Sequence, residues 1–276
     1  TPPLAEGRSA DDFSFSSFSL SSFSSLSSSS SRPSWFPRTS CREAWGNRDL
    51  SRYDETTDAR FKEGVGNLGY QNYLERIARY YGVRRADCHK DWTILVYMSA
   101  DNDLSPYALW DLHEMEGSFK GKHLAGSTLK TDLIVQADTA GRTGVRRLHI
   151  FQKPGDAYVA PRGVGDFVGA SPADVRSPII AMLDEKAPAN SNDHQDRLRA
   201  FLDWGMRAYP AEHYFVIMWG HGQGWTVDGK PLGGRFGGLA FSETEDDYLG
   251  IPSLSSILRE VKDATLEGRP IDMYAS

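Results

Sequence analysis

The sequence predicts an α/β protein in which a mostly parallel sheet lies between two layers of helices, with an N-terminal extension. From Asp91 onward, short continuous apolar runs alternate with amphipathic segments, which is the pattern of buried parallel strands joined by helices. The 276 residues, 39% of them hydrophobic, are enough for one sizeable domain with additional material. We therefore expect a three-layer α/β/α sandwich whose ligand site lies past the carboxyl ends of the strands.

The apolar runs predict five strands, at residues 93–98, 133–137, 148–152, 214–219 and 271–275. Helical spacing of apolar residues predicts three helices between them. In the first, Ser105 and Pro106 supply an N-cap and a first-turn proline, and the helix runs to about Lys120. The second covers about residues 195–209 and stops at Pro210, and the third begins near Ser253.

The sequence before Asp91 differs in composition and in the pattern of its apolar residues. Residues 1–34 are a serine-rich tail or linker, because residues 14–31 hold little besides serine, phenylalanine and leucine. Residues 35–90 predict a small helical extension or pro-region, and residues 91–276 form the main domain. Cys41 and Cys88 either form one disulfide, which would suit an exported protein, or remain two buried thiols.

Charge and hydropathy exclude several partners. The net charge is −6 and there is no basic stripe, so we expect neither nucleic acid nor an anionic membrane as a partner. No run approaches the ~20 apolar residues that a membrane-spanning helix needs. We therefore predict a protein without a membrane span.

Polar residues follow two of the predicted strands. The first strand ends in Ser-Ala-Asp-Asn-Asp at residues 99–103, and the fourth ends in Gly220-His221-Gly222. An imidazole between two glycines can accept a proton from a nucleophile or donate one to a leaving amine, and the N–H of Gly222 can face a ligand oxygen. A purely structural, hydrogen-bonding histidine is the alternative.

Three stretches together resemble the clostripain family of cysteine peptidases, which are related to caspases and gingipains. They are DWTILVYMSADNDL (91–104), HYFVIMWGHGQGW (213–225) and GGLAFSETEDDYLGIPSLSSIL (237–258). The resemblance covers residues 91–276, and it implies a caspase-like sheet with a Cys/His dyad that cuts protein or peptide substrates after Arg or Lys. It implies that His221 is the catalytic histidine and that the N–H of Gly222 helps to form the oxyanion hole.

The resemblance also implies where the nucleophile lies. In the family, the strand that matches residues 271–276 leads directly into an Asp-x-Cys element, so we expect the cysteine on a continuing or second chain. Cys88 precedes the first predicted strand and would lie at the amino edge of the sheet, opposite His221, and Cys41 lies outside the matching region. We therefore interpret both as structural. Ser276, at the correct end of the last strand, is an alternative nucleophile.

Relatives mature by self-cleavage after a basic residue, and Lys230 and Arg235 lie in a glycine-rich stretch that could be cut in this way. The expected function is therefore a secreted or periplasmic, autoprocessing endopeptidase that is inactive without its cysteine-bearing segment. The alternatives are a non-catalytic peptide-binding protein with the same fold and a hydrolase that depends on Ser276.

No cofactor and no zinc site are expected, because His221 has no second His or Cys at metal-binding spacing. Residues 242–247 concentrate four carboxylates, and some relatives need calcium. A Ca²⁺ site in this stretch is therefore left open beside the simpler interpretation of a solvated loop.

Overall fold

A computed structural model describes residues 32–45, 83–116, 126–127, 130–140, 145–150, 175, 177, 179–183, 193–222, 239–242 and 247–275. Residues 1–31 of the serine-rich tail and residues 46–82 of the predicted helical extension lie outside these residues. So do Lys230, Arg235 and Ser276.

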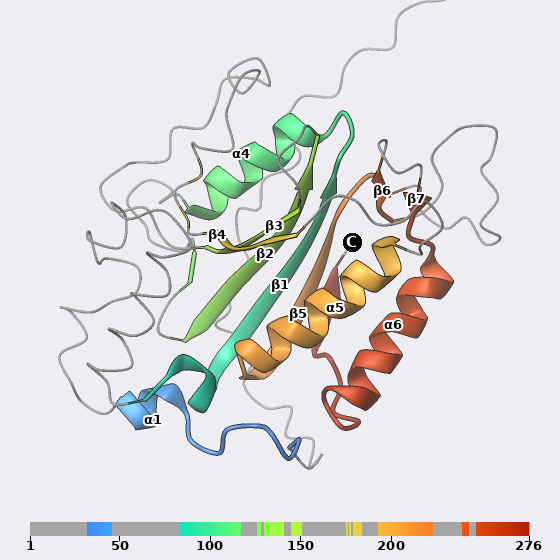
Figure 1. The fold of residues 1–276 in the computed structure, drawn as a ribbon. Helices are drawn as coiled ribbons and strands as arrows, with labels where there is room; N and C mark the ends of the chain where they lie inside the picture. The colour runs from blue at the N-terminus through green and yellow to red at the C-terminus, as the bar shows by residue number, and fades with distance from the viewer. Residues whose placement is uncertain are drawn as a thin grey trace, which may run out of the picture.

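A six-stranded sheet with the order β4-β3-β2-β1-β5-β8 forms the centre of the molecule (Figure 1). Strand β1 is parallel to both β2 and β5, and β5 is parallel to β8. Strand β3 runs antiparallel to both of its neighbours, β2 and β4. The strands are β1 (Lys90–Ala100), β2 (Thr131–Thr139), β3 (Val145–His149), β4 (Ile179–Leu183), β5 (Ala211–Gly220) and β8 (Met273–Ala275).

Helices cover both faces of this sheet. Helix α4 (Ser105–Glu116) lies on one face, whereas α5 (Asp193–Ala208) and α6 (Ile251–Ala264) lie together on the other (Figure 1). Alternate residues of β1 supply the two cores, because successive side chains of a strand point to opposite faces. Val96 and Met98 pack in the cluster that includes α4, and Leu95 and Tyr97 pack in the cluster that includes α5 and α6. The predicted three-layer sandwich with a mostly parallel sheet is confirmed.

The third strand differs from its prediction at residues 148–152. It covers residues 145–149 and is antiparallel to β2. Its bounds differ from the prediction because Arg146 and Arg147 are charged and look like loop residues in the sequence, yet both are buried in the structure. Arg147 donates to Gln136 Oε1 (2.9 Å) and lies over the ring of Trp204, with its guanidinium carbon 4.4 Å from the ring centroid.

Several shorter elements were not predicted. Strand β4 is one of them, and another is the hairpin of β6 (Phe241–Ser242) and β7 (Asp247–Tyr248). The N-terminal part contributes α1 (Cys41–Trp45) and the 3₁₀ helix η4 (Arg85–Asp87). Each of these is five residues or shorter, which leaves too few residues for a periodic pattern.

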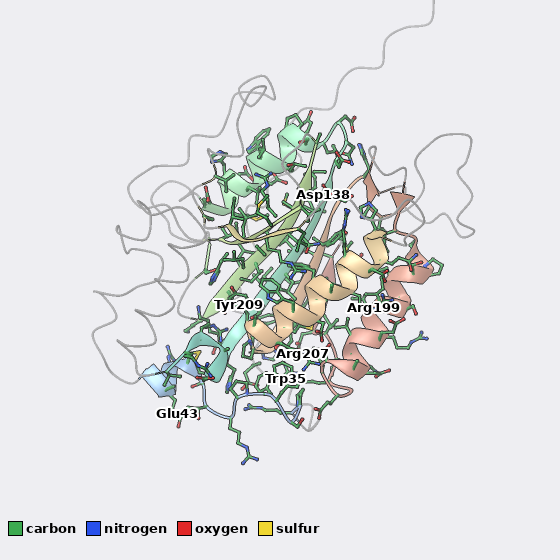
Figure 2. The ribbon with its side chains drawn as sticks, in the orientation of Figure 1. Trp35, Glu43, Asp138, Arg199, Arg207 and Tyr209 are labelled. Atoms are coloured by element: carbon green, nitrogen blue, oxygen red, sulfur yellow. A yellow bond between two sulfur atoms is a disulfide. The ribbon has the colours of Figure 1, made fainter. Side chains whose placement is uncertain are left out.

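Residues 32–45, here called the N-terminal strap, pack against the amino edge of the sheet (Figures 1 and 2). Cys41 and Cys88 form a disulfide, which decides between the two alternatives left open by the sequence. Trp35 donates its indole N–H to the carbonyl of Thr265 (2.8 Å), and the guanidinium of Arg207 lies over the Trp35 ring. The strap therefore joins the start of β1 to the turn after α6.

The same edge holds a buried ion cluster around Asp132, the second residue of β2. Its carboxylate accepts hydrogen bonds from Arg85 Nε (2.8 Å) and Lys90 Nζ (2.9 Å), and His149 Nε2 lies 3.2 Å away. Burial alone would raise the pKa of Asp132, but the positive charges of Arg85 and Lys90 and the hydrogen bond with His149 outweigh it and hold this pKa well below its ordinary value. The cluster fixes η4, β1, β2 and β3 to one another.

Candidate active site

The polar turns that follow β1 and β5 lie beside each other at the carboxyl edge of the sheet. The two strands are parallel, and Ser99 near the end of β1 is in register with Gly220 at the end of β5. Parallel strands bring their carboxyl ends to one edge, so the turn after each strand opens on the same side. Asp103 and His221, which are 118 residues apart in the sequence, meet there.

His221 is hydrogen-bonded to Asp103 at this edge. The imidazole Nε2 lies 2.5 Å from Asp103 Oδ1, and the side chains are 34% and 76% exposed, respectively. A carboxylate only accepts hydrogen bonds, so Nε2 carries the proton in this contact. Proton exchange with a reacting group then falls to the other ring nitrogen, Nδ1.

The two glycines beside His221 differ in what surrounds them. Gly220 has a φ of +154°, and a Cβ built there would lie 2.8 Å from the carbonyl oxygen of Ser99. The backbone of β1, and not a bound chain, therefore requires a glycine at this position. Among the residues that the structure describes, a Cβ at Gly222 would meet nothing within 4 Å, so the described part of the chain leaves space next to the histidine on that side.

Trp219 anchors the turn on the opposite side of Gly220. Its indole N–H donates to Asp111 Oδ2 of helix α4 at 2.5 Å. Burial raises the pKa of Asp111 to about 6, with the hydrogen bond from Trp219 acting against this rise and the charge of Glu114 adding to it. The carboxyl group of Asp111 thus titrates close to neutral pH.

Asn102 shapes the turn that carries Asp103. Its side-chain Oδ1 accepts the backbone N–H of Leu104 (2.9 Å), and its carbonyl accepts the N–H of Ser105 (3.1 Å). These bonds lead the chain from β1 into α4. The prediction that Ser105 is the N-cap is wrong, because Ser105 is the first residue of the helix and its hydroxyl accepts the N–H of Ala140 instead (3.1 Å).

Neither cysteine of the sequence lies near His221. Both are in the disulfide and are fully buried, and Cys88 stands two residues before β1, at the amino edge. The prediction that Cys88 lies opposite His221 is confirmed. Lys230, Arg235 and Ser276 are outside the described residues, so the structure does not place them relative to the histidine.

Within the described ranges, no group of three or more His, Cys, Asp or Glu side chains could hold a metal ion. Glu243 to Asp246, which make up most of the acidic stretch, are outside those ranges. No helix that the structure describes is both long and apolar enough to cross a membrane.

Asp103 and Asp111 are the site residues whose roles sequence reasoning missed. Asp103 belongs to the polar cluster at residues 99–103, but nothing in the sequence indicates which of its side chains reaches His221. Asp111 looks like any polar residue of an amphipathic helix. The one available signal is the alternation along the strands, which places Trp219 on the same face of the sheet as Val96 and Met98, the face that α4 covers.

Comparison with known proteins gives one family and several structures. A model of the clostripain family matches residues 96–272, which is more than half of the chain. No curated protein matches the sequence.

Three of the similar solved structures are bacterial cysteine proteases. A secreted C11 cysteine protease from Bacteroides thetaiotaomicron, in complex with an irreversible peptide inhibitor, is 24% identical, with a TM-score of 0.40 over 62% of this chain and 39% of its own. A cysteine protease of B. fragilis is 23% identical, with a TM-score of 0.34 over 49% of this chain and 92% of its own. The B. thetaiotaomicron protease "iotapain" is 13% identical, with a TM-score of 0.42 over 68% and 45%. The chain thus spans about two fifths of the length of the first of these proteins.

Proposed function

The chain belongs to the clostripain family, and we propose that it supplies the histidine of a cysteine endopeptidase that cleaves protein chains after Arg or Lys. The observation that carries this proposal is the placement of His221. Its imidazole lies at the carboxyl edge of the sheet, on a turn that Asp103 and Trp219 hold, and no residue that the structure describes crowds Gly222 beside it.

In the proposed mechanism, Nδ1 of His221 takes the proton of a thiol, and the thiolate attacks the carbonyl carbon of the scissile bond. The new S–C bond pushes the carbonyl electron pair onto oxygen, where the N–H of Gly222 helps to stabilise the negative charge. When this intermediate collapses, the C–N bond breaks and the proton on Nδ1 passes to the leaving amine. Water then hydrolyses the thioester and regenerates the thiol.

The thiol comes from a segment other than these 276 residues, because Cys41 and Cys88 are joined to each other at the amino edge. We propose that this segment either continues from the chain or belongs to a second chain associated with it. The disulfide also supports a secreted or periplasmic location, where the environment is oxidising.

The test uses the protein in its naturally occurring form, with denaturing intact-mass analysis and terminal sequencing of every polypeptide in the purified sample. Matched fluorogenic peptides with Arg, Lys, citrulline or norleucine before the scissile bond then measure activity. We expect cleavage of the Arg and Lys peptides alone, with inhibition by iodoacetamide. Cleavage of all four peptides would refute the proposed specificity.

His221→Ala should reduce kcat/KM by about 10²- to 10⁴-fold, since general acid–base catalysis contributes about that much. His113→Ala on helix α4 is the matched control and should leave the rate unchanged. Thermal unfolding of His221→Ala should resemble that of the wild type, because His221 is partly exposed. A normal rate in His221→Ala would remove the histidine from the mechanism.

The second candidate is a non-catalytic peptide-binding protein, and the pairing of both cysteines favours it. Saturable peptide binding without cleavage, in a sample that contains no further polypeptide, would support this candidate. Cleavage that iodoacetamide does not inhibit would instead point to the hydrolase that depends on Ser276.

A further inference from the structure

Two carboxylates from one segment of the chain hold the two aromatic rings that flank Gly220. Asp103, in the turn after β1, contacts His221 Nε2 at 2.5 Å, and Asp111, on helix α4, accepts the indole N–H of Trp219 at 2.5 Å. A third attachment lies between these rings, where Gly220 packs directly against the backbone of Ser99. The end of β5 and the turn after it are thus fixed to the β1–α4 segment at three successive residues, 219–221.

The three attachments constrain the imidazole in different ways. The close contact at Gly220 sets the path of the backbone, because no larger residue fits against Ser99. Trp219 points to the face of the sheet that α4 covers, where Asp111 fixes the rotation of its side chain. Asp103 then sets the orientation of the ring itself, since a 180° flip of the ring would put Cε1 in the place of Nε2 and break the hydrogen bond to Asp103.

We propose that Asp103 and Asp111 are positioning residues for His221, Asp103 by holding the Nε2–H tautomer of the imidazole and Asp111 by holding Trp219. The catalytic role in this inference rests on the proposed function. The contacts that place His221 and Trp219 do not depend on it. With Nε2–H committed to Asp103, every proton transfer in the mechanism passes through Nδ1, and the proton on Nε2 stays in place throughout.

Asp103 also stabilises the charge that forms during the reaction. When the thiol gives its proton to Nδ1, the imidazole becomes an imidazolium whose Nε2–H already faces a carboxylate. Asp103 is 76% exposed, so water weakens this attraction. We therefore expect an effect on kcat smaller than that of removing the imidazole.

The first experiment measures the tautomer of His221 in the 276-residue chain and needs no activity. Long-range ¹H–¹⁵N NMR correlations at pH 8 distinguish Nε2–H from Nδ1–H, and the spectrum of His221→Ala identifies the signal among the seven histidines. We expect the Nε2–H tautomer in the wild type, a mixture in Asp103→Ala, and a return to Nε2–H in Asp103→Asn, whose amide oxygen still accepts the bond. Asp91→Asn, an exposed aspartate at the amino edge, is the control and should change nothing.

A parallel measurement follows the indole N–H of Trp219, identified by Trp219→Phe. Asp111→Leu keeps the branched arrangement of heavy atoms but has no acceptor, so the Trp219 N–H signal should move upfield and exchange faster with water. Asp111→Asn keeps an acceptor oxygen and should retain the signal. An unchanged tautomer in Asp103→Ala, or an unchanged Trp219 signal in Asp111→Leu, would overturn the corresponding half of the proposal.

The second experiment measures kinetics on the active enzyme. Asp103→Ala should lower kcat by about 10- to 100-fold, less than the ~10²- to 10⁴-fold of a lost general acid–base group. KM should change by less than about threefold, because the imidazole is positioned for the transition state and not for substrate binding. Asp103→Asn should recover part of the rate, and Asp111→Leu should lower kcat more than Asp111→Asn does.

The two experiments fail separately. If the wild type cleaves no peptide but shows the expected tautomers, the proposed function is wrong and the positioning of His221 stands. If the enzyme is active and Asp103→Ala keeps both its tautomer and its kcat, the pair is only a surface contact and the positioning role is wrong.

Discussion

Asp111 shows how one residue couples pH to stability at the candidate site. Its pKa is raised to about 6 in the folded protein, chiefly by burial, whereas an aspartate in an unfolded chain titrates near 3.9. Between these two values the folded state binds a proton that the unfolded state has lost. The free energy of unfolding therefore falls as the pH rises from about 4 to about 6. Above pH 6 the Asp111 carboxyl group is ionised in both states, and the free energy of unfolding does not fall further on its account.

Asp111→Asn should remove this penalty while keeping an acceptor for Trp219. We expect the variant to be more stable than the wild type by up to about 3 kcal/mol above pH 6, with the difference vanishing below about pH 4. Urea unfolding at several pH values from 4 to 8 measures this difference. A difference that does not vary with pH would show that Asp111 ionises as it would in water.

Gly220 and Gly222 form a matched pair for substitution. Gly220→Ala places a methyl group against the carbonyl of Ser99 at a backbone angle that side chains rarely adopt, so we expect a loss of more than about 1 kcal/mol. Gly222→Ala places the same group where no described residue lies within 4 Å, and it should leave stability almost unchanged. Denaturant unfolding of the two variants decides the point, and equal stabilities would refute the close contact with β1.

At the scale of elements, the N-terminal strap shows what holds the amino edge together. The disulfide joins positions 47 residues apart, and the strap adds hydrogen bonds from Trp35 to Thr265 and from Ser34 to Glu267. The ion cluster of Asp132 lies against the same edge, where Arg85 Nη1 reaches the carbonyl of Cys88 (2.7 Å). The strap, the disulfide and the ion cluster therefore stabilise the amino edge of the sheet. The polar turns lie at the carboxyl edge.

Replacing both Cys41 and Cys88 by serine should cost about 4 kcal/mol of unfolding free energy, the chain-entropy value for a loop of this length. The same double variant should retain full peptidase activity below its melting temperature, because the disulfide lies at the edge opposite His221. Thermal unfolding and the Arg and Lys peptide assay measure the two effects. A folded variant without activity would make one of these cysteines the nucleophile and contradict their structural role.

At the scale of the whole molecule, the two edges of the sheet have separate roles. The described part of the N-terminal extension packs at the amino edge (Figure 2) and so does not cover His221 at the carboxyl edge. If maturation controls this protein, the control therefore acts through other residues. Lys230 and Arg235 follow His221 in the sequence by 9 and 14 residues, which makes their segment the candidate.

Lys230→Ala combined with Arg235→Ala should therefore block internal cleavage of the protein. Mass spectrometry of the purified double variant should find no terminus within residues 230–236, where the wild type yields one. His221→Ala should block the same cleavage if the protein processes itself. Cleavage that persists in the double variant would assign maturation to another bond or another peptidase.

The sequence by itself determined the order of strands and helices, the three-layer class and the placement of His221 at a strand end. These features follow from local patterns, since the spacing of apolar residues indicates which face of each element is buried. The long strands β1, β2 and β5 and the helices α5 and α6 were accordingly predicted to within a few residues. The short β4, β6 and β7 were not predicted, because so few residues carry no clear period.

Only the tertiary structure decided which side chains meet. The partners of His221 and Trp219 lie 118 and 108 residues away, and Asp132 meets Arg85 across 47 residues. A local pattern cannot specify such pairs, because they arise only when strands distant in sequence become neighbours in one sheet. For the same reason, the disulfide and the positions of Asp103 and Asp111 became visible only in the assembled fold.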